Sequence, residues 1–408
     1  MVYFQVKHTF VPLLSVVFVI MSASTTEHLS DVAKASNEFS FHLYKTLLPT
    51  TKDQNIFFSP ISITTVLSMT HLGARGQTAD QMKQVLRFQH IEDAQYHRSF
   101  KEMNQLLYTS DGSNILKSAN RLFSHQGFRI QDEFLRQTKT HYGSELATHD
   151  FIQNSEEAVK AINAWVERET DGKIKGLIQN IDPMIRLILI NAIYFKGMWL
   201  QQFDEQNTRK SSFYVSSKDK LECNLMYQKR EFNLTYDSEN KCAVLDLPYK
   251  GNDLSMLIVL PDEVDGLTRL ENKLSASLLQ SWTSKLESEK VELWLPKFSL
   301  SQKFQLNDAL TKMGMGYLFD AAKADLSGIA EELFVSEVIH KAFIEVNEEG
   351  SEAAAATAVK MMKRSIELVT QFRADHPFLF VIRDRRTEVA LFMGRMAKPP
   401  NGNGHDEL

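Results

Sequence analysis

Short apolar segments in the second half of the chain are the feature that most limits the possible folds. Residues 187–194, 256–260, 378–382 and 389–393 each form an apolar run of the length of a buried strand. Residues 291–295 alternate apolar and polar side chains, which is typical of a strand with one solvated face. The first half of the chain instead favours helices. Helices followed by many strands predict an α+β fold built around large sheets.

The clearest helix is predicted over residues 154–168. Asn154 and Glu157 have the spacing of a capping box at its start. One face of this helix is apolar and is formed by Val159, Ile162, Trp165 and Val166. We therefore expect this helix to lie on an apolar surface.

The N-terminal segment, residues 1–24, has the pattern of a secretory signal peptide. An apolar run over 11–21 is followed by the small residues Ser22, Ala23 and Ser24, which favour cleavage near Ser24. The run is too short to cross a bilayer comfortably, so a retained membrane anchor is the weaker alternative and no membrane insertion is expected. The mature chain is then predicted to be a single domain over 25–400, because no linker divides it. We expect it to be a monomer.

The C-terminus ends in a tetrapeptide of the Lys-Asp-Glu-Leu class, which a recycling receptor of the endoplasmic reticulum (ER) reads at a free C-terminus. Its residues are His405, Asp406, Glu407 and Leu408. The preceding residues 401–404 have little to bury, so the tail 401–408 is expected to be flexible. Both termini together predict the ER lumen and early secretory pathway, with an ER-retrieval receptor as a partner. The fraction that escapes retrieval and is secreted stays open.

Composition and motifs exclude several classes of function. The chain carries 46 basic and 51 acidic side chains and a net charge of -5, without a basic field that would suit nucleic acid. It has no Gly-x-Ser-x-Gly elbow, His-Glu-x-x-His motif or phosphate loop, so an enzyme, a cofactor and a metal site are not expected. Cys223 and Cys242 either form one bridge or both stay free. Asn233 lies in the only glycosylation sequon.

An alanine-rich segment over residues 350–359 has two interpretations. Its composition alone favours a surface helix. However, it follows an apolar strand-like segment, 342–346, and leaves a connection of about 25 residues before the next strand near Pro377, which is unusually long for a compact domain. Long connections of this kind are usually functional.

Several segments, in order and at consistent spacing, resemble the serpin family of protease inhibitors over essentially the whole mature chain. The segments that carry this resemblance are 55–63, 191–199, 338–341, 372–384 and 391–396. The resemblance implies three β-sheets, about nine helices and an exposed reactive-centre loop at about 350–371. It also assigns residues to the shutter and breach regions, where the main sheet opens: Ser59, Pro60, Ser62, Asn191, Trp199 and His340. The alternative for His340 is a buried structural histidine, and the alternative for Trp199 is ordinary core packing.

The resemblance implies suicide inhibition. A serine protease cleaves the loop, and the N-terminal side of the loop then inserts as a new strand of the largest sheet and distorts the acylated enzyme. The hinge that inserts first consists of Gly350, Ser351, Glu352, Ala353, Ala354, Ala355, Ala356 and Thr357. In a strand, the side chains alternate between two registers, and both charges, Glu352 and Lys360, fall in the same one. The other register is uncharged and can pack under the sheet.

The family's spacing places the reactive bond at Arg364–Ser365, fourteen positions after Gly350. The expected protease-recognition residues are Met361, Met362, Lys363 and Arg364. A Lys-Arg pair in the secretory pathway predicts a furin- or kexin-like proprotein convertase, and a trypsin-like protease is the alternative. Met361 stands where furin itself usually prefers an arginine, which argues against furin more than against the convertase class.

A non-inhibitory role is the second functional hypothesis, because the family includes an ER-retrieved collagen chaperone. Non-inhibitory members tend to carry bulky or charged residues in the hinge. The hinge here is small and mostly uncharged, so the sequence favours inhibition.

Overall fold

The computed structural model describes residues 13–108, 114–349, 369–400 and 405–407, and within 13–27 and 405–407 it describes the backbone only. The α-helices of this part are α1 (Leu13–Leu47), α2 (Pro60–His71), α3 (Gly76–Leu86), α4 (Asp93–Tyr108), α5 (Asp132–Tyr142), α6 (Ser155–Glu169), α7 (Leu267–Lys273), α8 (Ala276–Thr283) and α9 (Asn307–Met313). Most of the long helices precede the main run of strands, as the sequence predicts.

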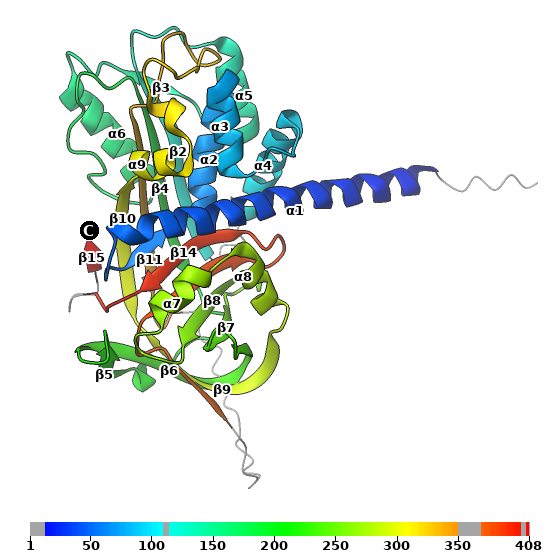
Figure 1. Cartoon of the computed structure of the whole chain (residues 1–408), viewed down its shortest axis with the longest axis vertical. Coiled ribbons are helices and arrows are strands. Elements are labelled where there is room, and N and C mark those ends of the chain that lie inside the picture. Colours follow the sequence, from blue (N-terminus) through cyan, green and yellow to red (C-terminus); the bar gives the residue numbers. More distant parts are fainter. Residues whose placement is uncertain (1–12, 109–113, 350–368, 401–404, 408) are drawn as a thin grey trace, which may run out of the picture.

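A six-stranded sheet has the order β15-β10-β11-β4-β2-β3. Its strands are β2 (Asn114–His125), β3 (Ala147–His149), β4 (Leu187–Gly197), β10 (Phe298–Gln305), β11 (Glu337–Val346) and β15 (His405–Glu407). The two central strands, β4 and β11, run parallel to each other, whereas β2–β4 and β10–β11 are antiparallel pairs. One face of this sheet packs against α2 and the other against α6 (Figure 1).

A nine-stranded sheet contains the other strands in the order β1-β14-β13-β8-β7-β6-β9-β12, with β5 paired to β6. They are β1 (Ile56–Phe58), β5 (Arg209–Tyr214), β6 (Lys220–Asp237), β7 (Cys242–Pro248), β8 (Leu254–Pro261), β9 (Glu287–Pro296), β12 (Thr370–Arg373), β13 (Phe378–Asp384) and β14 (Ala390–Met396). The long strand β6 pairs with β9 through 225–234 and with β7 through 233–237. Strand β6 therefore joins the part of this sheet that contains β7 and β8 to the part that contains β9 and β12. Counted separately, these two parts and the six-stranded sheet are the three expected sheets. The predicted α+β fold is confirmed.

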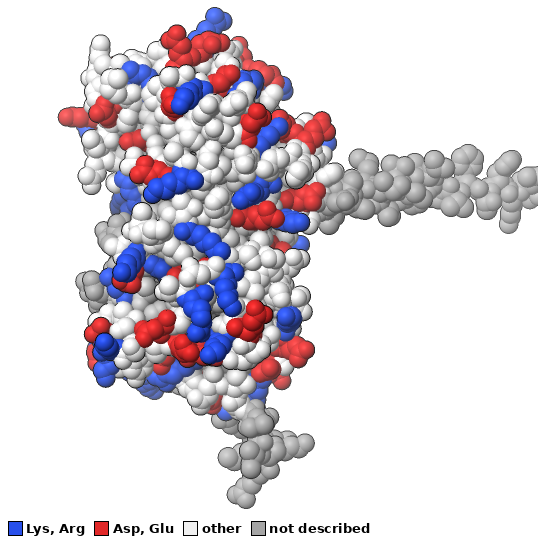
Figure 2. Space-filling model, in the orientation of Figure 1, with Lys and Arg blue, Asp and Glu red and all other residues white. Residues whose placement is uncertain are grey.

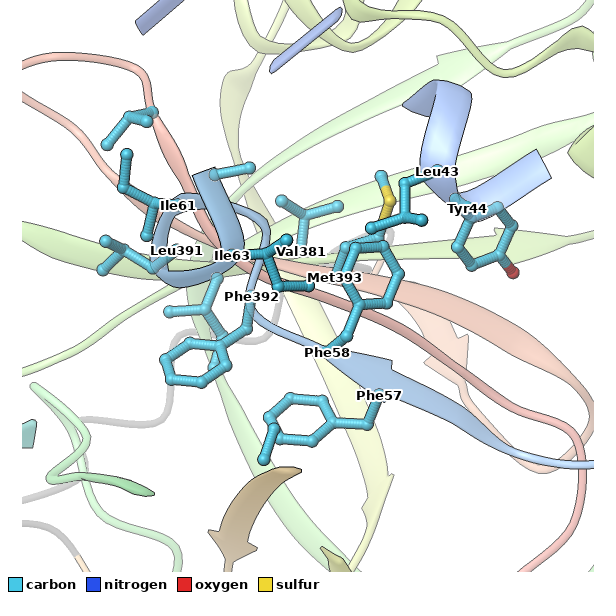
Figure 3. Close-up of a cluster of buried hydrophobic side chains, with 14 of the residues drawn as sticks. Leu43, Tyr44, Phe57, Phe58, Ile61, Ile63, Val381, Leu391, Phe392 and Met393 are labelled. Carbon is cyan, nitrogen blue, oxygen red and sulfur yellow. The ribbon is translucent and has the colours of Figure 1, made fainter. Parts of the chain in front are cut away.

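A large apolar core lies where the helices meet the nine-stranded sheet (Figure 3). Figure 3 shows side chains of β1, α1, α2 and β14 converging on it, among them Phe57, Leu43, Ile63 and Phe392. Phe57 stacks on Phe392 with ring centroids 5.2 Å apart. This packing fixes the start of α2 against β14, and that position matters for the site described below.

The helix predicted over 154–168 is confirmed as α6, and its capping is not. Ala158, Ile162, Trp165 and Val166 are buried on its sheet-facing side. The Asn154 side chain makes no capping bond to the helix and instead donates to Asp150 Oδ2 at 3.1 Å. The capping-box prediction is therefore wrong, because Asp150 offers this side chain a charged acceptor.

Helix α1 extends away from the body of the protein at its N-terminal end (Figure 1) and runs continuously through Ser24. The predicted signal-peptide cleavage point therefore lies within a helix of this chain, and the signal peptide stays a prediction. Within the described part of the chain, no helix has both the length and the hydropathy that crossing a bilayer requires. Over much of the face shown in Figure 2, Lys and Arg side chains lie beside Asp and Glu side chains.

Candidate functional site: the seam between β4 and β11

The candidate site is the line along which β4 and β11 meet, which we call the seam. Residues Glu337–Glu345 of β11 pair in parallel with Ile188–Lys196 of β4, so the seam is closed along its length. The chain leaves β11 after Val346 and continues toward the predicted loop. The loop's hinge, recognition and reactive-bond residues, 350–365, lie outside the described residues.

A row of polar side chains crosses the sheet at the middle of the seam. Asn191 of β4 is the register partner of His340 on β11 and of Asn120 on β2. His340 and Asn191 are fully buried, and His340 Nδ1 is hydrogen-bonded to Asn191 Oδ1. The Asn191 Nδ2 group donates to Asn120 Oδ1 and to Ser62 Oγ. One hydrogen-bonded network therefore joins three strands of the sheet across the seam.

Helix α2 supplies the other half of this network. Ser59 is its N-cap and accepts from the Ser62 amide at 3.4 Å, and Pro60 occupies the first helical turn, where its missing N–H group leaves no acceptor unpaired. The Ser59 amide donates to His340 Nε2 at 3.1 Å, and Ser59 Oγ donates to the Leu391 carbonyl at 2.6 Å. The start of α2 thus bridges β11 and β14.

The tautomer of His340 follows from these partners. Nε2 accepts a backbone N–H, so Nδ1 carries the proton and donates to the Asn191 carbonyl oxygen. Burial lowers the pKa of His340 to about 3. The imidazole is therefore neutral at physiological pH, and protonation of Nε2 would remove its bond to Ser59.

Two members of the network, Ser118 and Asn120 of β2, were missed by the sequence analysis. Ser62 Oγ lies 3.3 Å from Ser118 Oγ and donates to Asn120 Oδ1 at 3.1 Å. These two β2 residues are spaced two apart, so they point to the same face of the strand. Polar residues at alternate positions of a partly apolar strand were the available signal.

Trp199 lies beyond the end of β4 rather than in the network. It is 2% exposed, stacks on Tyr249 with centroids 4.5 Å apart, and donates from Nε1 to the Asn347 carbonyl at 2.8 Å. Asn347 follows β11 directly. Trp199 therefore ties the segment that leads into the predicted loop to the connection between β7 and β8 of the nine-stranded sheet.

Ion pairs hold the same end of the seam, and the sequence analysis did not find them. Glu348 is 5% exposed and accepts from Lys297 at 2.6 Å and from Thr208 Oγ1 at 2.8 Å. Glu345 accepts from Lys173 at 3.0 Å and from the Tyr194 hydroxyl at 2.9 Å. A strand that enters from this end must displace or pass these contacts.

Two further predicted features lie elsewhere. Asn233 is half-buried within β6 and pairs in register with both β7 and β9. Cys223 and Cys242 are both free, and burial raises the pKa of their thiols to about 11 and about 12. The open alternative of a bridge between them is therefore not realised.

The C-terminal residues His405–Glu407 differ from the expected flexible tail. They form β15, which pairs in parallel with Ser299–Ser301 of β10. Because β10 would otherwise be the edge of the six-stranded sheet, its unpaired backbone groups offer hydrogen bonds to any extended segment within reach. Leu408 lies outside the described residues.

Comparison with known proteins gives a consistent match. The sequence model of the family described as serpin (serine protease inhibitor) matches residues 34–399. The leukocyte elastase inhibitor of Sus scrofa is 42% identical over 381 residues, covering 91% of this chain and 100% of that protein. The leukocyte elastase inhibitor of Homo sapiens is 40% identical over the same length, with the same coverage.

Solved structures show the same similarity. Uncleaved ovalbumin superposes with a TM-score of 0.84 at 32% identity, covering 90% of this chain and 100% of ovalbumin. Human thyroxine-binding globulin superposes with a TM-score of 0.83 at 31% identity, covering 91% and 99%. Similar proteins therefore include ones whose names describe an inhibitor and one whose name describes a binding protein.

Proposed function

Because this chain belongs to the serpin family, whose sequence model covers residues 34–399, we propose that it is a suicide inhibitor of a serine protease that cleaves after Arg364. The observation that carries the proposal is the closed parallel seam between β4 and β11, which continues directly into the loop segment. The protein then performs no catalysis of its own. The protease supplies the chemistry, and the fold supplies the trap.

Geometry determines how the loop enters. The loop follows β11, so a loop strand lying beside β11 runs opposite to it, and it also runs opposite to the parallel neighbour β4. Insertion therefore replaces one parallel pair by two antiparallel pairs, which are slightly more stable per residue. It also moves β4 and β11 from about 4.8 Å to about 9.6 Å apart. The direct bond between Asn191 and His340 must break.

The residues that line the two faces of the seam constrain the inserted strand. On the α2 side they are apolar apart from Asn191 and His340. On the α6 side, Ile188, Ile190 and Ile339 are also buried, whereas Lys196 and Glu345, near the end that leads into the loop, are partly exposed, as are Glu337 and Lys341 of β11. Glu352, early in the loop, would enter at this end, where Lys173 and Lys196 can pair with it. The single hinge charge is thus compatible with insertion.

The hinge composition separates inhibition from a binding or chaperone role. Seven of the eight positions 350–357 are glycine, serine, alanine or threonine, so they fit between two strands with little overpacking. Thyroxine-binding globulin has a similar fold, so the fold alone does not distinguish the two roles. An ER-retained chaperone is the second candidate, and the hinge argues against it.

For the target we propose a protease with Lys-Arg specificity, with the proprotein convertases preferred over trypsin-like enzymes. Lys363 and Arg364 present two cations that suit acidic subsites. The similar leukocyte elastase inhibitors are named for a different protease, so the preference rests on the loop sequence and on the proposed location. That location is the ER and early secretory pathway, supported by the two terminal signals.

The decisive experiment incubates the purified protein with a kexin-type convertase, trypsin and leukocyte elastase, followed by denaturing electrophoresis. A detergent-resistant band with a Lys-Arg-cleaving protease, absent from Arg364→Ala, is expected. We expect the Arg364→Ala protein to be as stable as the wild type, because a side chain that must be offered to a protease leaves no cavity when it is lost. Cleavage without a covalent band contradicts inhibition. A complex that Arg364→Ala does not diminish assigns the bond elsewhere.

The proposed location is tested by deleting His405–Leu408. The shortened protein should appear in the medium and should inhibit as well as the full chain, although it loses the β15 pairing to β10. Continued retention inside the cell would contradict the retrieval signal.

A further inference from the structure

Residues of α2, α3, α4 and α5 line a surface cavity of about 410 Å³. These four helices lie together at one end of the molecule (Figure 1). None of its lining residues belongs to the seam network. Its polar lining consists of His71, Arg75, Lys83, Asp93, His97, Arg136, Gln137, Thr140 and His141. Such a concentration of cations and imidazoles in one concave site is not needed for loop insertion.

His71 forms the buried part of this cavity. It is the last residue of α2, is 4% exposed, and stands edge-on to Phe88 at 5.1 Å. Neither of its ring nitrogens has a hydrogen-bond partner among the described residues. A buried polar group without a partner costs about 1–3 kcal/mol, so a molecule that supplies one binds there favourably.

The charge of the lining selects an anion. Arg75, Lys83 and Arg136 line the cavity with one carboxylate, Asp93, which Lys83 pairs at 2.6 Å. Arg136 pairs with Glu133 outside the lining, so three cations stand against two carboxylates. Arg75 is held in place by bonds from its Nη1 to the Leu72 and Ala74 carbonyls, at 3.0 and 2.7 Å. Among the described residues, no three His, Cys, Asp or Glu side chains form a group that could hold a metal ion. The described residues therefore offer no metal-ligand group in this cavity.

The protonation of the imidazoles limits which anions can pair with them. Burial lowers the pKa of His71 to about 4 and that of His97 to about 3, so both are neutral at physiological pH. Each neutral imidazole has one N–H donor and one acceptor nitrogen. A ligand that satisfies both nitrogens of His71 must bring an acceptor and a donor. At physiological pH a phosphate monoester, whose second pKa is about 6, is mostly a dianion that only accepts, as a sulfate ester does, so a hydroxyl group of the ligand must supply the donor.

We propose that this cavity binds a small phosphate ester that also carries hydroxyl groups, of the size of a sugar phosphate. The volume lies at the lower end of the range of small-molecule pockets. The phosphate contacts Arg75, Lys83 and His71, and the hydroxyls face Gln137 and Thr140 on α5. This site is independent of the proposed inhibition, so a result that contradicts one proposal does not contradict the other.

The test is titration calorimetry of the full chain with glucose 6-phosphate, glucose 6-sulfate, inorganic phosphate and glucose. We expect glucose 6-phosphate to bind most tightly. Inorganic phosphate should bind more weakly because it lacks the sugar hydroxyls, and glucose 6-sulfate should bind several-fold more weakly because it carries one negative charge rather than about two. His71→Phe keeps an aromatic ring against Phe88 and should weaken glucose 6-phosphate binding about tenfold or more. Lys83→Gln, at a partly exposed position, should weaken it about fivefold. Lys160→Gln, in an exposed ion pair on α6, is the matched control and should change nothing.

Several results would overturn the proposal. One is the absence of heat with glucose 6-phosphate and with inorganic phosphate at 10 mM. Another is binding that Lys83→Gln and His71→Phe leave unchanged, which places the anion elsewhere on the surface. Equal affinity for glucose 6-phosphate and inorganic phosphate would contradict the part assigned to the sugar hydroxyls. If His71→Phe fails to fold, the comparison of Lys83→Gln with Lys160→Gln still decides.

Discussion

The two sheets bury their central strands equally well, but they are held together differently. In the nine-stranded sheet, all residues of β8, β13 and β14 are buried, the strands are antiparallel, and the side chains are mainly apolar. In the six-stranded sheet, the central pair is parallel and is crossed by the buried polar row of Asn120, Asn191 and His340. Apolar packing has no discrete alternative partner, whereas hydrogen-bonded side chains can exchange one partner for another. The sheet proposed to open is the one built with exchangeable bonds.

The largest effect is expected from the hinge, which sharpens the contrast directly. Ala353→Arg places a guanidinium in the uncharged register of the loop, where it must be desolvated beneath the six-stranded sheet at a cost of several kcal/mol. Because about 1.4 kcal/mol on a barrier is a factor of ten in rate, insertion slows by orders of magnitude and hydrolysis of the acyl-enzyme prevails. Titration of protease against inhibitor should show a substrate rather than an inhibitor.

Ala354→Arg is the control for that prediction, because by parity it points to the other face. It should retain more inhibition, although α6 covers part of that face and reduces the contrast. Wild-type stoichiometry for Ala353→Arg would contradict both insertion and the assigned register.

Substituting one glycine in each sheet tests whether the nine-stranded sheet is the more rigid of the two. A Cβ at Gly394 of β14 would lie 2.4 Å from the backbone oxygen of Ile56 on β1, whereas a Cβ at Gly197 of β4 would meet the Tyr249 ring at 2.3 Å. The backbone cannot move without parting β1 from β14, but a ring can shift. We expect Gly394→Ala to lower the free energy of unfolding by about 3 kcal/mol or more, and Gly197→Ala by about 1–2 kcal/mol. Urea unfolding of both variants measures the difference, and the reverse order would refute this view of the two sheets.

The polar row of Asn120, Asn191 and His340 should contribute more to the stability of the protein with a closed seam than to that of the protein with an opened seam. Asn191→Leu leaves His340 Nδ1, Ser62 and Asn120 without their shared partner, so the intact protein should lose about 2–3 kcal/mol of stability. After loop insertion, the direct bond between Asn191 and His340 no longer exists, so the loss in the cleaved protein should be smaller. Unfolding of intact and cleaved forms compares the two losses. An equal loss in both forms would mean that the row is ordinary structural bonding.

Near neutral pH, the smallest expected effect is the pH dependence of the closed form. The pKa of His340 is lowered to about 3 by burial, against about 6.5 in an unfolded chain. Between these values the unfolded chain binds the extra proton, so the native state loses up to about 1.4 kcal/mol per pH unit as the pH falls, and nothing above about pH 6.5. His71 and His97 contribute in the same direction. His340→Gln should therefore reduce the slope of stability against pH without abolishing it; an unchanged slope would show that His340 does not titrate in this window.

Much of the fold could be predicted because burial alone determines it. The apolar runs at 187–194 and 378–382 became β4 and β13, and the apolar face of 154–168 became α6. The prediction of a capping box at the start of α6 was wrong because Asp150, outside the helix, accepts the hydrogen bond of the Asn154 side chain. The pairing of β15 with β10 was not predicted for a similar reason, since the sequence alone does not show which open strand edge the C-terminal segment can reach.

The site was predicted in part, on resemblance rather than on spacing. Ser59, Ser62, Asn191 and His340 do meet in one network. Asn120 joins them through the register of β2 with β4, and Glu348 pairs with Lys297 across a long chain separation. Neither contact has a local sequence signature, because register and tertiary pairing are properties of the assembled sheet.

The most direct test of the seam is heat unfolding before and after a single cut in the loop. A protease that the protein does not trap cuts the chain once within 350–365, and calorimetry compares the two forms. If the loop becomes a new strand between β4 and β11, the cut protein gains several kcal/mol and unfolds at least about 10 °C higher than the intact one. An unfolding temperature that stays the same or falls after the cut would contradict insertion at this seam.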